Sequence, residues 1–159
     1  MKRLIAAAAV LAVGVSIAVT SVGGAQTSGE RTLKFVEKGG SSKFINLPPV
    51  QGQHKAPTPG DEFVFASPLY DESGARAGFV DVHCAVGVGV SRNVADCIGT
   101  AKLKDGTITV AGLSGDSRTT VVSITCGTGA YEGARGSITS IARSGANNAP
   151  SDDTVHLLG

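Results

Sequence analysis

The sequence predicts an all-β fold, in which an antiparallel sheet closes as a barrel or packs as a sandwich. The first observation is the spacing of the apolar residues, which recur at every second position. Residues 80–90 place a row of Val and Cys side chains on one face, and Asp81 and His83 on the other. The second observation is a set of turn signals, rich in Gly, Ser, Asn and Asp, that separates such stretches at 72–74, 91–93, 104–106 and 114–116.

The chain begins with features typical of a secretory signal peptide. A basic head over residues 1–3 precedes an apolar, Ala-rich run over residues 4–19, and small residues follow as far as Ala25. We expect cleavage near Ala25, which leaves one exported, extracellular domain over residues 26–159. The alternative is an uncleaved membrane anchor, although a run this short is marginal for the ~20 residues that a bilayer span needs.

Charge and composition argue against nucleic acid and metal as partners. The full chain has 14 basic and 13 acidic side chains, and removing residues 1–25 takes away Lys2 and Arg3, which leaves 12 against 13. No basic cluster follows, so the electrostatic footprint of a nucleic-acid-binding protein is missing. His54, His83 and His156 lack the spacing of zinc ligands. We therefore predict no nucleic acid, no metal and no cofactor.

The expected strands follow the leader in order. Leu33, Phe35 and Glu37 share one face of the first strand, and residues 79–103 are expected to form two strands without a helix. Lys104-Asp-Gly106 predicts a tight hairpin, since Asp-Gly suits a two-residue turn. Residues 38–60 are rich in Gly, Ser and Pro, and are predicted to be a long irregular connection that either covers a barrel mouth or is mobile. The side chains expected to point inward include Val80, Val82, Val86, Ile108, Val110, Val122 and Ile124, and alternation places Cys126 on the same face as Val122 and Ile124.

A glycine-rich stretch over residues 127–136 resembles a phosphate-binding loop at first sight. A dinucleotide-binding turn needs a third glycine where this chain has Glu132, and it leads into a helix, whereas residues 136–142 continue as a strand. No Gly-Lys-Ser/Thr follows either, and Glu132 would repel a phosphate. We therefore expect the glycines to shape the connection between two strands.

The same stretch, GTGAYEGARG, resembles the signature of the allene oxide cyclase and dirigent barrels. Further matches occur in the same order at Gly60-Asp61, Leu69-Tyr-Asp71, Gly78 with Cys84, and residues 109–112. The resemblance covers roughly residues 31–142. It implies a small antiparallel barrel of eight strands, calycin-like, around an apolar cavity, and relatives that assemble as trimers or hexamers, so a homo-oligomer such as a trimer is expected.

The resemblance implies two kinds of chemistry. In allene oxide cyclases a carboxylate in the first strand stabilises the positive charge that develops as an epoxide opens, and Glu37 holds that place, while Cys84 matches a cavity cysteine. The asparagines that hold a water in those enzymes correspond to Gly39 and Ser67. Dirigent proteins steer radical coupling with polar groups that include an arginine, and Arg135 matches it. The candidate catalytic residues are thus Glu37 and Cys84, and the candidate ligand-binding residues are Phe35, Phe65, Ser67, Tyr70, Tyr131 and Arg135.

The three cysteines allow one internal disulfide. Cys84 and Cys97 are expected on consecutive strands and on the same inward face, where directly opposed residues come within reach of a disulfide. Cys126 belongs to a strand that should neighbour neither. We therefore predict a Cys84–Cys97 bridge with Cys126 free, which would remove the Cys84 thiol from the cavity.

Three functional hypotheses remain open at the level of sequence. The first is a barrel that binds a small apolar metabolite, the second an isomerase or cyclase of the allene oxide cyclase kind or a dirigent-like guide, and the third a structural module with a filled barrel. A sizeable internal volume would dismiss the third, and a buried carboxyl group facing it would favour the second.

Overall fold

The computed structural model describes residues 29–47, 57–87, 94–115, 117–146 and 149–158. Within these residues all regular structure is β-strand, and none of them forms a helix that is long and apolar enough to cross a membrane. The predicted leader, residues 1–25, lies outside the described residues. The strands are β1 (Arg31–Glu37), β2 (Ser41–Ile45), β3 (Glu62–Tyr70), β4 (Arg76–Val86), β5 (Ala95–Leu103), β6 (Gly106–Ser114), β7 (Thr119–Gly129), β8 (Arg135–Ala142) and β9 (Ser151–Leu158).

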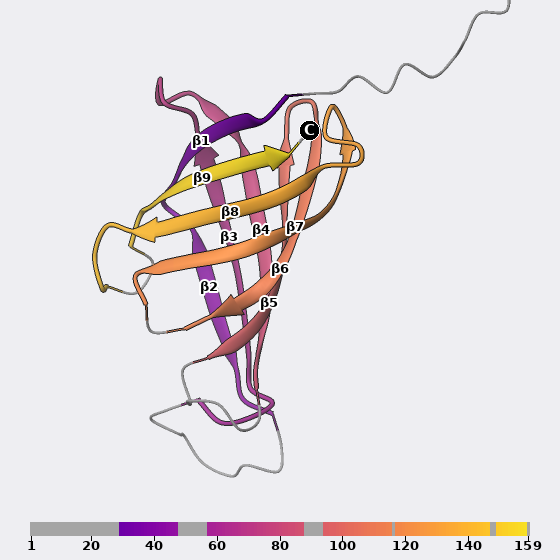
Figure 1. Cartoon of the computed structure of the whole chain (residues 1–159). Helices are drawn as coiled ribbons and strands as arrows, with labels where there is room; N and C mark the ends of the chain where they lie inside the picture. The colour runs from indigo at the N-terminus through magenta and orange to yellow at the C-terminus, as the bar shows by residue number, and fades with distance from the viewer. Residues whose placement is uncertain (1–28, 48–56, 88–93, 116, 147–148, 159) are drawn as a thin grey trace, which may run out of the picture.

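The strands form one antiparallel sheet that closes into a barrel, as the sequence predicts. The order is β1-β9-β8-β7-β6-β5-β4-β3-β2, and β1 also pairs with β3, which joins the two sides. Figure 1 shows β7, β8 and β9 crossing in front of β2, β3 and β4. Eight strands complete the barrel, and β2 is the additional one.

The first side of the barrel is a strand broken in two. Val36 and Glu37 of β1 pair with Tyr70 and Leu69 near one end of β3, and β2 pairs along the rest of the same edge. Gly39, at a φ of +74°, lies in the break between them. The prediction of an irregular connection over residues 38–60 is therefore wrong for Ser41–Ile45, which pairs with the edge of β3 that β1 leaves open. Residues 48–56 lie outside the described part.

The central strands follow the predicted alternation. On β4 and β5 the inward side chains of Cys84, Val86 and Cys97 are buried, whereas Asp81 and His83 are exposed. The hairpin predicted at residues 104–106 joins β5 and β6, with Leu103 opposite Gly106. No described residue within 79–103 is helical.

One inward assignment is wrong. Val122 lines the interior and Ile124 is buried in the core, but Cys126 is exposed. The register between β6 and β7 shifts between Thr109 and Val110, so that Cys126 lies opposite Thr109 and Ile124 opposite Val110. Such a bulge adds one residue to β7 and reverses the facing of every residue beyond it.

The glycine stretch turns the sheet between β7 and β8, as expected. Gly129, Gly133 and Gly136 have positive φ, at 63°, 72° and 135°. A Cβ on Gly127 would lie 2.1 Å from the carbonyl oxygen of Tyr131, so the turn folds back closely on the end of β7. Tyr131 is buried in the turn and belongs to the core cluster that fills this end of the barrel.

The barrel is packed at one end and hollow towards the other. The larger core cluster gathers residues from several strands at the packed end: Leu69, Leu103, Ile108, Ile124, Tyr131, Val155 and Leu157. A smaller cluster joins Cys84, Ala95 and Cys97. Val80, Val110 and Ile138 face inward yet are only partly buried, because they line open space.

Candidate functional site: a lumen with two carboxyl groups

The interior of the barrel holds two connected spaces, which we call the lumen and the vestibule. The lumen has a volume of about 180 Å³ and the vestibule, towards the open end, about 620 Å³. Both are lined by Glu37, Phe65, Cys84, Cys97 and Ser114. A structural module with a filled interior is excluded by this space, which far exceeds a few waters.

The wall of the lumen is mainly apolar. Because side chains alternate along β-strands, the wall is built from inward-facing side chains of β1 and of β3 to β9. The apolar members are Phe35, Phe65, Leu69, Val80, Val82, Ala101, Leu103, Ile108, Val110, Val122, Ile138 and Val155. The polar members are few: Glu37, Asp153, Ser114, Thr120 and Ser140.

Glu37 lies at the end of β1, at the seam where the barrel closes. It pairs across the sheet with Ser151 on one side and Leu69 on the other. Burial raises the pKa of its carboxyl group above the ordinary value, the negative charge of Asp153 raises it further, and a hydrogen bond from Ser67 partly offsets both effects. Glu37 therefore holds its proton closer to neutral pH than an exposed glutamate does.

Asp153 is the second carboxyl group of the lumen, and only 8% of its surface is exposed. Burial raises its pKa, hydrogen bonds from Ser140 and Ser151 lower it in part, and the charge of Asp152 raises it again. The Ser151 hydroxyl donates to Asp153 Oδ1 over 3.0 Å. Asp153 is not among the residues predicted from the sequence, because Asp152-Asp153 resembles a turn. The alternation of Ser151, Asp153, Val155 and Leu157 nevertheless marks an inward face.

Cys84 and Cys97 form a disulfide, as predicted, with Cα atoms 4.0 Å apart on directly opposed positions of β4 and β5. It lies in the wall shared by the lumen and the vestibule. Cys84 therefore presents a disulfide and not a thiol to the interior, which corrects the expectation of a cavity thiol. Cys126 is free and exposed.

The remaining candidates divide between the interior and the outside. Phe35 lines the lumen, Phe65 lines both spaces, and Ser67 lines the vestibule beside Glu37. Tyr70, Tyr131 and Arg135 line neither space.

The two tyrosines are covered by cations outside the lumen. The Lys38 Nζ lies 4.6 Å from the centre of the Tyr70 ring, and the Arg31 guanidinium lies 5.6 Å from the centre of the Tyr131 ring. Arg135 is exposed at the start of β8. Sequence alternation alone does not separate these residues from the true wall, because all three lie at strand ends or turns.

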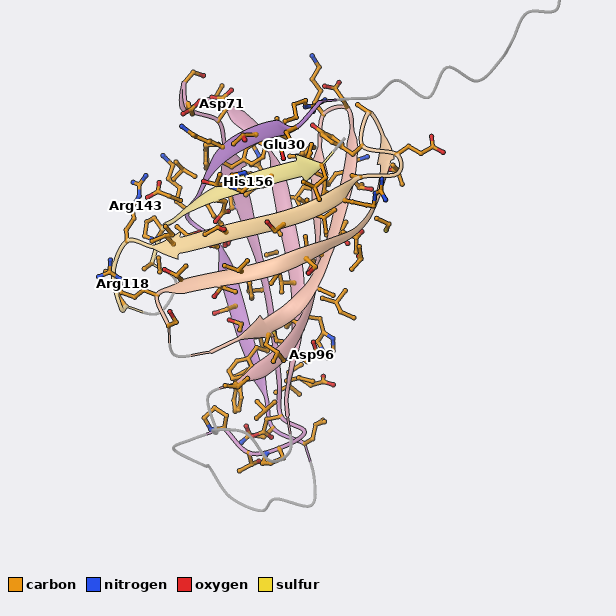
Figure 2. All side chains as sticks on the ribbon, viewed as in Figure 1. Glu30, Asp71, Asp96, Arg118, Arg143 and His156 are labelled. Atoms are coloured by element: carbon orange, nitrogen blue, oxygen red, sulfur yellow. A yellow bond between two sulfur atoms is a disulfide. The ribbon has the colours of Figure 1, made fainter. Side chains whose placement is uncertain are left out.

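The rim of the vestibule lies where the connections from β6 to β7 and from β8 to β9 meet. Gly115, Ala142, Ala146 and Ala149 line this side. Figure 2 shows Arg118 and Arg143 along the same edge of the barrel, and the Arg118 carbonyl accepts a hydrogen bond from the Ala142 amide over 2.8 Å. Arg143 is paired with Asp152 over 2.6 Å and 3.1 Å.

Comparison with known proteins shows the fold. No protein-family model and no curated protein matches the chain. Among solved structures, a pyocyanin demethylase is 22% identical, with a TM-score of 0.65, and the match covers 80% of this chain and 99% of that one. A pterocarpan synthase dirigent protein is 16% identical with a TM-score of 0.66, over 84% and 97% of the chains. The Diels Alderase AbmU from Streptomyces koyangensis is 16% identical with a TM-score of 0.60, over 80% and 67%. The chain thus has the barrel fold of dirigent proteins and of cyclase-like barrels, as its sequence indicated.

Proposed function

We propose that this protein binds a small, mainly apolar molecule inside its barrel. The observation that carries the proposal is the lumen itself, an apolar space of about 180 Å³ that continues into a vestibule of about 620 Å³. Ligand sites are commonly concave and apolar, with a few polar groups that fix orientation. Glu37, Asp153 and Ser67 supply those groups here.

Native mass spectrometry of the protein purified from its own source tests this function. We expect an additional mass that corresponds to a small molecule and that disappears when the protein is denatured. The control is the same protein refolded from denaturant, which should bind the extracted molecule again. A refolded protein that takes up neither the extract nor any aromatic probe would contradict the proposal.

A second candidate function is an isomerase or cyclase that works in the same lumen, or a dirigent-like guide. It is favoured by Glu37, whose raised pKa lets it donate a proton to a bound molecule or, once ionised, stabilise a developing positive charge. Such a role predicts that Glu37→Gln leaves ligand affinity largely unchanged but abolishes turnover. The dirigent-like hypothesis has less support, because Arg135, the arginine that the resemblance implies for it, lines neither the lumen nor the vestibule.

We also propose that the protein acts outside the cell. The basic head, the apolar run and the small residues up to Ala25 support this, and so does the disulfide, because disulfides persist mainly in oxidising compartments. Intact-mass measurement of the protein from culture medium should give a chain that begins at Gln26. Recovery of the full-length chain in the membrane fraction would favour the anchor instead.

A further inference from the structure

We infer that the molecule bound in the lumen is an organic cation: a small ring system that carries a protonated or quaternary nitrogen. This inference rests on the proposed binding function and narrows it to one ligand class. It follows from the charges of the wall, their hydrogen bonds and the size of the space.

The charges of the lumen wall have one sign. Among the described residues that line it, the ionisable side chains are Glu37 and Asp153, and none is Lys, Arg or His. Lys38 and Lys43 line the vestibule only and are exposed, and Lys38 lies over the Tyr70 ring. No described side chain in the lumen therefore neutralises an ionised carboxylate.

Hydrogen bonds stabilise these carboxyl groups only in part. Glu37 accepts from Ser67, and Asp153 accepts from Ser140 and Ser151. An ionised carboxylate has about four acceptor positions, so single hydroxyl donors leave several of them open. Hydroxyl dipoles also do not supply the opposite charge that a buried carboxylate needs to stay ionised at low cost. A ligand with a positively charged nitrogen would supply the opposite charge, and its N–H groups would fill open acceptor positions.

The walls suit the rest of such a ligand. A space of about 180 Å³ is close to the size of an apolar cavity that holds one aromatic ring, roughly 150 Å³, and the vestibule leaves room for more. Phe35 and Phe65 line the same wall, and aromatic rings attract cations. A ligand carboxylate placed in the lumen would meet two acidic groups, so a free organic acid is disfavoured there.

Three naphthalene probes of similar size and different charge test the ligand class: 1-naphthylmethylamine as the ammonium ion, 1-naphthalenemethanol, and 1-naphthoate. Their affinities are measured on the whole mature protein by naphthalene fluorescence at neutral pH. We expect the ammonium to bind at least ~10-fold more tightly than the alcohol, since one pK unit of stabilisation corresponds to a factor of ten. We expect 1-naphthoate to bind most weakly.

Two variants locate the effect. Asp153→Asn and Glu37→Gln keep the side-chain shape and should each reduce the ratio between ammonium and alcohol, with the affinity for the alcohol little changed. The control is Glu132→Gln, in the exposed turn between β7 and β8, which should keep the ratio. If either variant fails to fold, the affinities of the three probes for the unaltered protein still decide the ligand class.

A ligand whose positive charge does not depend on pH shows how the protonation of the protein alone affects binding. Binding of N-methylquinolinium should strengthen as pH rises, because ionised Glu37 and Asp153 attract it, and should release protons when measured by calorimetry in two buffers. Ser67, Ser140 and Ser151 donate hydrogen bonds to this pair, and Lys38 and Lys43 line the vestibule. Asp152, next to Asp153 in the chain, is exposed on the outer side of β9 and paired with Arg143. A pH-independent affinity without proton release would contradict the inference.

The outcomes separate this inference from the binding function. If the alcohol binds as tightly as the ammonium, or 1-naphthoate binds best, the ligand class is wrong while binding in the lumen stands. If no probe binds, the inference fails, and the native mass measurement decides the binding function separately.

Discussion

Gly136 adopts a φ of +135°, in the region that side chains rarely occupy, and a Cβ there would lie 1.9 Å from the His156 carbonyl oxygen. We therefore expect Gly136→Val to lower the free energy of unfolding by more than ~1 kcal/mol. Gly145→Val is the matched control, because nothing lies within 4 Å of its Cβ position. Urea unfolding of the two variants measures the difference. Equal stabilities would show that the turn tolerates a side chain.

Glu37 gives a pH dependence with a definite sign. Its pKa is raised on folding, so the folded state binds more protons than the unfolded chain, and stability falls as pH rises from the ordinary pKa of a glutamate through the raised one. Glu37→Gln removes this contribution. The variant should therefore gain stability relative to the unaltered protein between about pH 4 and neutral pH.

The measurement is the difference in free energy of unfolding between the two proteins as a function of pH. This comparison cancels the opposite contribution of Asp152, whose pKa is lowered by Arg143 and whose stabilisation is lost in acid. A difference that stays constant over the range would mean that the Glu37 pKa is the same in both states.

At the scale of strands, the disulfide fixes β4 to β5 where the lumen opens into the vestibule. The two cysteines are 13 residues apart in sequence. Removing a crosslink over a loop of that size typically costs ~2–4 kcal/mol, so we expect Cys84→Ala with Cys97→Ala to lose about that much. Cys126→Ala should stay within ~0.5 kcal/mol, because its side chain is exposed. Thermal and urea unfolding compare the three proteins, and a double variant as stable as the control would contradict the expectation.

Strands are also the scale at which the sequence predicts well, and at which its limits are clear. Alternation locates the inward faces of β4 to β6, and from them the disulfide, because a period of two is a property of the strand itself. The bulge that turns Cys126 outward cannot be located from that alternation. One extra residue in β7 exchanges the inward and outward positions beyond it, and the pattern of residue types does not show where the exchange occurs. The sequence did not predict β2 as a strand, because the Gly, Ser and Pro residues around it resemble a loop. Its pairing also depends on a free edge of β3 that only the folded barrel supplies.

At the scale of the whole molecule, the sequence predicted the barrel and one of the two carboxyl groups that line its lumen among the described residues. Glu37 became a candidate because the resemblance implies a carboxylate in the first strand, and alternation independently places it on an otherwise apolar face. Asp153 comes to the same space from the far end of the chain, through the pairing of β9 with β1, where Phe35 lies opposite Asp153. The proximity of Glu37 and Asp153 depends on closure of the barrel, which local residue patterns do not describe.

The outer surface bears on the expected homo-oligomer. Each strand from β5 to β8 carries an exposed aliphatic side chain on this surface: Ile98, Leu113, Val121 and Ile141. If copies assemble through this face, Val121→Lys should convert an oligomer into a monomer without loss of stability. Light scattering after size-exclusion chromatography measures this, with Glu132→Lys in the exposed turn between β7 and β8 as control. If the unaltered protein is a monomer, the expectation of a homo-oligomer is wrong.

The bulge between β6 and β7 has a practical consequence for labelling. Because it turns Cys126 outward while Cys84 and Cys97 are joined inside, the unaltered chain offers a single thiol to a maleimide reagent among its described residues. A fluorophore attached there would lie on the outside of the barrel and leave the lumen open. Energy transfer from a naphthalene bound inside to a suitable acceptor on Cys126 would then report occupancy without any substitution in the protein.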